Sequence, residues 1–153
     1  MRAVTAFLSF RREDAAACTR FRRRYEPVAG LTFAVHPFAY GVADWKTPCR
    51  AMIERSDGVV VLIGATTAES ASVRWEIDIA GRCGKRVLGV LLPGGRPSVP
   101  ALLPPTMIVP WADSRIPTEL ASWSPAAGPE TAGSPPHGCQ PSATTAAMIA
   151  ASP

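Results

Sequence analysis

Lysine is nearly missing from this sequence. Only Lys46 and Lys85 are lysine among 16 basic residues, and the rest are arginine. Twelve acidic residues reduce the net charge to +4. The arginines gather at 11–12 and 20–24, and the second group falls near the end of a predicted helix, where cations complement the helix dipole and face solvent. Such a small excess is weak evidence for a nucleic-acid partner, and we expect none.

Long apolar runs are also absent. No run approaches the roughly 20 residues that a membrane-spanning helix requires. The apolar run near the N-terminus is short, ends in four charged residues (11–14) and is not followed by a small-residue cleavage site, so it is not typical of a signal peptide. We therefore expect a cytoplasmic protein without a membrane partner.

The sequence lacks the spacing of a metal site. Its cysteines and histidines are Cys18, Cys49, Cys83, Cys139, His36 and His137. The cysteines form no CxxC pair, and the two histidines do not complete a ligand set. Three of the cysteines fall on predicted helices among apolar neighbours, so we interpret them as small buried thiols in a reducing compartment and expect no metal.

Short apolar runs alternate with amphipathic stretches, which is typical of a parallel sheet with helices on both faces. The predicted strands are 3–10, 31–35, 58–64, 86–92 and 107–111. The predicted helices are 13–25, 44–55, 70–83 and 117–123. Residues 58–64 are a continuous apolar run bounded by glycines, as expected for a central strand. Pro110 cannot donate to a neighbouring strand and marks the fifth strand as an edge.

The composition changes sharply after residue 123. A chain of 153 residues, 47% of them hydrophobic, has room for one compact domain. Residues 124–153 consist mainly of proline, glycine, alanine, serine and threonine, and Glu130 is their one charge. We predict one domain over 1–123 and a disordered tail over 124–153.

Several nucleotide-binding functions are excluded by missing motifs. Ligands of open parallel sheets bind beyond the carboxyl ends of the strands. Neither GxGxxG nor GxxxxGK[ST] occurs at these positions, which argues against a dinucleotide fold of the Rossmann type and a P-loop. The third strand does not end in the aspartate of a response-regulator receiver, and residues 10–13 (FRRE) do not form a flavodoxin phosphate loop.

The third predicted helix carries the most informative carboxylate. At about 100° per residue, Val73, Ile77 and Ala80 form its buried stripe, and Glu76 lies about 60° from Val73 at the rim of that stripe. Taken alone, Glu76 fits an ordinary glutamate near a helix start, favoured by the dipole. Residues 66–69 (TTAE) fit a capping box, which explains Glu69.

Five segments, in this order and strand context, resemble the TIR-like domains of prokaryotic Thoeris antiphage systems. They are 8–14 (LSFRRED), 38–45 (FAYGVADW), 58–67 (GVVVLIGATT), 70–77 (SASVRWEI) and 84–91 (GKRVLGVL). The resemblance covers about residues 3–92 and, more loosely, 107–123. It implies an α/β flavodoxin-like three-layer sandwich whose central parallel sheet has about five strands.

The resemblance also implies an activity. Family members split NAD at the nicotinamide–ribose bond, and Glu76 occupies the position of their catalytic glutamate. NAD is then the substrate, and no cofactor is implied. The product would be a cyclic ADP-ribose isomer, or ADP-ribose, and the cyclic isomer would act as an immune second messenger on a separate downstream effector. TIR domains generally act as assemblies, so a homo-oligomer is expected.

Several other residues are candidates for substrate binding because they lie at the edge of the sheet formed by the carboxyl ends of the strands. Ser9, Phe10 and Arg11 leave the first strand there, and an arginine could meet the pyrophosphate. Asp44 and Trp45 open the second helix, where a carboxylate could bind hydroxyls and a ring could stack on a base. Ser70 starts the third helix. Capping and packing are equally good explanations for each of these substrate-binding candidates.

The chain departs from the family at one position, and two other functions are considered beside NAD cleavage. Many TIR domains have tryptophan four residues before the glutamate, where this chain has Ser72; its tryptophan is Trp75 instead. The main alternative is a non-catalytic TIR scaffold that self-associates or recruits partners, in which Glu76 merely caps or solvates a helix. A weaker one is a nucleoside-type hydrolase or transferase that uses the same pocket.

Overall fold

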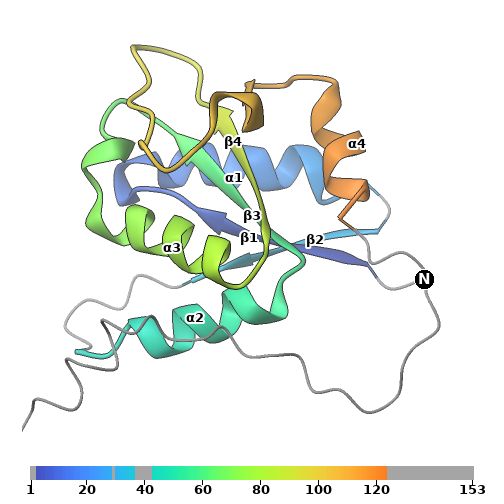
Figure 1. Cartoon of the computed structure of the whole chain (residues 1–153). Coiled ribbons are helices and arrows are strands. Elements are labelled where there is room, and N and C mark those ends of the chain that lie inside the picture. The colour runs from blue at the N-terminus through green and yellow to red at the C-terminus, as the bar shows by residue number, and fades with distance from the viewer. Residues whose placement is uncertain (1–2, 29, 37–42, 124–153) are drawn as a thin grey trace, which may run out of the picture.

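The computed structural model describes residues 3–28, 30–36 and 43–123. The predicted tail over 124–153 lies outside the described residues, so the division into a domain and a tail stays a prediction. Figure 1 shows a central sheet with helices on both sides. The expected α/β flavodoxin-like fold is confirmed.

All five strands run parallel, in the order β2-β1-β3-β4-β5. They are β1 Val4–Ser9, β2 Leu31–Val35, β3 Gly58–Ile63, β4 Arg86–Leu91 and β5 Ile108–Pro110. Every residue of β3 is buried, as its unbroken apolar sequence predicts. β5 is an edge strand and contains Pro110, which confirms the expectation for that segment.

Four α-helices form the two outer layers. They are α1 Ala15–Tyr25, α2 Lys46–Arg55, α3 Ala71–Arg82 and α4 Arg115–Ala121. Short 3₁₀ turns, η1 Arg12–Asp14, η2 Thr67–Glu69 and η3 Pro105–Met107, connect the main elements. α1 and α4 cover one face of the sheet and α2 and α3 the other (Figure 1). Within the described ranges, no helix has the length and apolar character needed to cross a membrane.

Alternation along the strands divides the hydrophobic core in two. In β3, Val60 and Leu62 join the cluster under α1 and α4, whereas Val59, Val61 and Ile63 join the cluster under α2 and α3. This is the two-residue period of a strand whose faces are both covered. The same alternation decides which face receives the side chains at the end of β1.

The predicted element boundaries shift by only a few residues, but the predicted capping box is wrong. The side chain of Thr66 makes no capping hydrogen bond. Ser70 directly precedes α3, and its Oγ accepts a hydrogen bond from the Val73 backbone N–H at 3.3 Å. Thr67 Oγ1 instead accepts from the Gly64 N–H at 2.7 Å, which fixes the turn after β3. Ser70 is therefore the helix cap, because it is the residue with extended backbone next to the first turn.

The cysteine prediction is confirmed at two positions and wrong at a third. Cys18 and Cys49 are free and buried. Cys83 is disulfide-bonded. It lies at the end of α3 and is only partly buried, at the margin of the core under α2 and α3.

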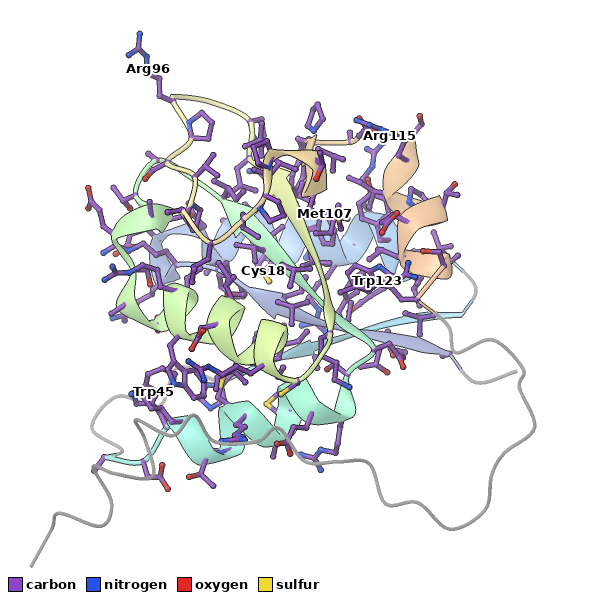
Figure 2. All side chains as sticks on the ribbon, in the orientation of Figure 1. Cys18, Trp45, Arg96, Met107, Arg115 and Trp123 are labelled. Carbon is purple, nitrogen blue, oxygen red and sulfur yellow. The ribbon has the colours of Figure 1, made fainter. Side chains whose placement is uncertain are left out.

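We predict opposite effects of alanine at two glycines. A Cβ on Gly58 would lie 2.5 Å from the ring of Trp123, at the end of the sheet opposite Trp45 (Figure 2), so Gly58→Ala should cost about 2 kcal/mol through overpacking. A Cβ on Gly81, near the end of α3, meets nothing within 4 Å, so Gly81→Ala should stabilise by roughly 0.5 kcal/mol or more. Urea unfolding of both variants measures the difference. Equal effects would contradict the packing described for Trp123.

Candidate active site

The site lies where the sheet changes direction. β1 and β3 are neighbours, but the chain continues from β1 to β2 on one side and from β3 to β4 on the other. Open α/β sheets of this order bind ligands beyond the carboxyl ends of the strands at such a switch point. Ser9 ends β1 at this edge, and Gly64 follows β3.

α3 brings Glu76 to this edge. The helix starts at the Ser70 cap and packs its buried stripe against the sheet, with Val73, Ile77 and Ala80 in the core as predicted. Glu76 lies on the same side and is 9% exposed. The carboxylate is therefore part of the buried face rather than its solvated rim, so the simple reading of Glu76 as a solvated helix-start glutamate does not describe it.

Two neutral donors hold the Glu76 carboxylate. The Ser9 hydroxyl donates a hydrogen bond to Oε2. The Cys49 thiol donates to Oε1, with 3.7 Å between sulfur and oxygen. The three residues come from β1, α2 and α3, so the cluster exists only after these elements have packed together. Among the described residues, no positively charged side chain forms an ion pair with this carboxylate.

Burial controls the ionisation of this group. Loss of water around the carboxyl raises the pKa of Glu76 from 4.5 to about 7, although the hydrogen bonds from Ser9 and Cys49 act to lower it. A carboxyl group with such a pKa changes its charge near neutral pH. Perturbed carboxyl groups at a ligand edge are candidates for catalysis.

Two tryptophans pair between the start of α2 and α3, the helix that carries Glu76. Trp45, labelled in Figure 2, directly precedes α2. Its ring meets that of Trp75 of α3 edge to face, with 5.1 Å between the ring centroids. Lys46 Nζ lies 5.8 Å from the Trp45 ring centroid and 5.7 Å from that of Trp75. Both residues are partly buried and pack against the core under α2 and α3. The pairing of Trp75 with Trp45 depends on how α2 and α3 meet, so a single sequence does not predict it.

The Arg11 side chain forms a hydrogen bond and ion pairs within the chain. Its Nη1 donates to the Thr66 carbonyl at 3.0 Å and lies 3.7 Å from Glu69, while its Nε lies 3.1 Å from Glu13. The side chain joins the segment after β1 to the segment after β3. Part of its hydrogen-bonding capacity is therefore used within the chain.

The remaining substrate-binding candidates have visible structural roles. Phe10 is buried in the core under α1 and α4, on the face opposite Glu76, because it alternates with Ser9. The structure thus does not bring Phe10 to the carboxylate. Asp44 Oδ1 accepts from the hydroxyl of Thr47 at 2.9 Å at the start of α2. Ser70 caps α3, and its Oγ is 3.1 Å from that of Ser72.

Cys49 is the member of the site that sequence reasoning missed. Its position on α2 one turn before Ile53 places both residues on the buried side of the helix, and the sequence indicates no more than that. Nothing in a single sequence shows that the thiol of one helix meets the carboxylate of another.

Glu76 does not line either of two surface hollows. One is lined by Leu88, Thr106, Met107, Val109, Arg115, Ile116 and Glu119, and the other by Ile77, Asp78, Gly81, Arg82 and Leu102. Across the described ranges, no three His, Cys, Asp or Glu side chains are grouped so that they could hold a metal ion. The site brings together a carboxyl group, a hydroxyl and a thiol, with the Trp45–Trp75 pair on the same side of the sheet.

Part of the chain matches a known family. Residues 41–97 match the family model for the TIR-like domain of Thoeris protein ThsB. The matched range contains Asp44, Trp45, Cys49, Ser70 and Glu76, and it ends beyond β4. No curated protein matches the chain.

We predict that Glu76 makes stability depend on pH. The unfolded carboxyl ionises near 4.5 and the folded one near 7, so the folded protein binds the extra proton between these values and its free energy of unfolding falls as the pH rises through them. The loss should reach roughly 3 kcal/mol at most. Glu76→Gln should remove it, as measured by urea unfolding between about pH 4 and pH 8. Parallel pH profiles for the two proteins would contradict the assigned environment.

We predict that Ser9 keeps this pKa from rising further. Ser9→Ala removes a donor to Oε2, and the ionised form loses more than the neutral form. The pKa of Glu76 should therefore increase, as measured by NMR titration of the side-chain carboxyl carbon. Thr5→Ala, a hydroxyl deletion in the same strand with its partner on Thr32, is the matched control and should leave the titration unchanged. An unshifted midpoint in Ser9→Ala would exclude the hydrogen bond.

Proposed function

Because this chain carries a Thoeris-type TIR-like domain, we propose that it cleaves NAD at the nicotinamide–ribose bond with Glu76 as the catalytic carboxylate. The observation that carries the proposal is the position of this carboxylate. It is buried at the carboxyl edge of the sheet, beside the β1/β3 switch point, with neutral hydrogen-bond donors and a pKa near neutral.

The reaction needs a negative charge near the ribose. The bond between the anomeric carbon and the pyridinium nitrogen breaks, and its electron pair goes to the ring, so nicotinamide leaves as a neutral molecule. Positive charge develops on the anomeric carbon and ring oxygen, and the ionised Glu76 stabilises it. An oxygen or nitrogen nucleophile then bonds to the anomeric carbon, and a proton is released from the attacking hydroxyl, water or base. The leaving group needs little acid assistance, so one carboxylate suffices.

The identity of the nucleophile decides the product. Water gives linear ADP-ribose, whereas an atom of the same ADP-ribose gives a cyclic isomer. In our proposal the cyclic product is an immune second messenger in antiphage defence, read by a separate effector, and the enzyme works as a homo-oligomer.

The other site residues have roles that fit this chemistry. The paired rings of Trp45 and Trp75 offer area for stacking a planar base next to Glu76. Ser9 holds the carboxylate, and Ser70 positions α3. Asp44 and Arg11 have unused polar atoms in addition to their internal contacts and stay candidates for substrate hydroxyls and the pyrophosphate.

A non-catalytic scaffold is the second candidate. The observations that favour it are that Glu76 is only 9% exposed and that Ser9 and Cys49 already donate to both of its oxygens. In that case the carboxylate serves the packing of α2 and α3, and the domain acts through its surfaces.

Nicotinamide release separates the two functions. We expect purified protein to release nicotinamide from NAD, with a rate that rises with pH through about 7 as Glu76 ionises. Glu76→Gln should reduce kcat roughly 100-fold or more, the order seen when a group that stabilises transition-state charge is removed.

The control is Glu54→Gln. Glu54 pairs with Arg50 at 3.1 Å on the outer side of α2, so its loss should leave the rate unchanged. No nicotinamide release by the wild-type protein, even at high concentration and after a phage trigger, would reject the enzyme in favour of the scaffold.

A further inference from the structure

Cys49 is the least accessible polar group of the site. Its exposed fraction is 0%, and it lies on the buried side of α2 facing α3 and the sheet. Burial and the adjacent Glu76 raise the pKa of the thiol well above its usual range. The sulfur thus keeps its proton at neutral pH and is a permanent hydrogen-bond donor rather than a nucleophile.

The two hydrogen bonds to Glu76 come from different elements and hold both of its carboxylate oxygens. Ser9 donates to Oε2 from β1, and Cys49 donates to Oε1 from α2, so each carboxylate oxygen has one donor and each donor belongs to a different element. A carboxyl group held at both oxygens cannot rotate freely about its terminal bond. Both donors also favour the ionised form, because a carboxylate accepts hydrogen bonds more strongly than a carboxylic acid.

We propose that Cys49 is a positioning residue for Glu76, whose thiol orients the carboxyl group and favours its ionised form. Cys49 is fully buried and acts through Glu76 without touching substrate. The consequence for turnover rests on the proposed function, but the effect on Glu76 itself does not.

The groups that face Glu76 make the inference testable. Cys49 is the titratable group contributed by α2, and Ser9 is the polar group contributed by β1. Within the described residues no ion pair involves Glu76. A change at Cys49 therefore acts on the carboxyl group without a competing salt bridge.

The decisive experiment compares two substitutions that change the donor in opposite directions. Cys49→Ala removes the donor and should raise the midpoint of the Glu76 titration by roughly half a pH unit, the order of one weak hydrogen bond. Cys49→Ser replaces a weak donor by a stronger one and should lower the midpoint. NMR titration of the Glu76 carboxyl carbon, in the full chain and without NAD, measures both.

Cys18→Ala is the matched control. Cys18 is a buried thiol of α1 on the opposite face of the sheet, so this variant reproduces the loss of a buried thiol without touching Glu76. It should leave the titration unchanged. Equal midpoints for wild type, Cys49→Ala and Cys49→Ser would overturn the proposal. A shift in the same direction for both variants would also overturn it, because packing rather than donation would then be responsible.

A measurement on the wild-type protein covers the case in which a Cys49 variant does not fold. The infrared S–H stretching band of Cys49 should shift as Glu76 ionises, and this shift should vanish in Glu76→Gln. A band that does not respond to pH would overturn the proposal.

If the protein cleaves NAD, the pH midpoint of kcat should follow the Glu76 titration across the variants while KM stays constant. A midpoint of kcat that stays fixed while the Glu76 titration shifts would overturn the role in turnover. Shifts in the titration without any NAD cleavage would reject the proposed enzyme while leaving the positioning of Glu76 intact.

Discussion

The burial of one carboxyl group among neutral donors is the constraint on which the site depends. Glu76 lies where β1, α2 and α3 meet, buried away from water and, among the described residues, without an ion-pair partner. Desolvation of an unpaired carboxylate is costly, and here two hydrogen bonds offset only part of the cost. A group held in this way contributes little to stability at neutral pH, and such perturbed carboxyl groups are candidates for catalysis.

The rest of the fold positions the two donors, Ser9 and Cys49, around the acceptor Glu76. The alternation of β1 turns Ser9 toward α2 and α3 and Phe10 toward α1. The Ser70 cap fixes where α3 begins and therefore where Glu76 lies along it. Arg11 and Thr67 hold the segments that follow β1 and β3 through contacts with Thr66 and Gly64. The contacts of Ser70 and Thr67 are local, whereas that of Arg11 joins residues 55 positions apart, and together they determine the position of the carboxylate.

The geometry of β1 explains why only one of the three candidates at its end reaches Glu76. Residues at the ends of parallel strands share one edge, so proximity to the edge was predictable for Ser9, Phe10 and Arg11 together. Proximity to Glu76 was not, because it depends on the face of the strand as well. Ser9 reaches the carboxylate, Phe10 enters the opposite core, and Arg11 joins two neighbouring segments.

The sequence by itself determined the α/β architecture, the central place of β3, the edge position of β5 and the buried stripe of α3, because period and composition are local properties of the chain. The resemblance of residues 70–77 to a known family also singled out Glu76 as the candidate catalytic residue. Only the tertiary structure decided that Cys49 and Ser9 donate to that carboxylate, that Trp75 pairs with Trp45, and that Ser70 rather than Thr66 is the helix cap. The hydrogen bonds to Glu76 and the tryptophan pair join residues 27 to 67 positions apart along the chain, so packing creates them and no local pattern records them.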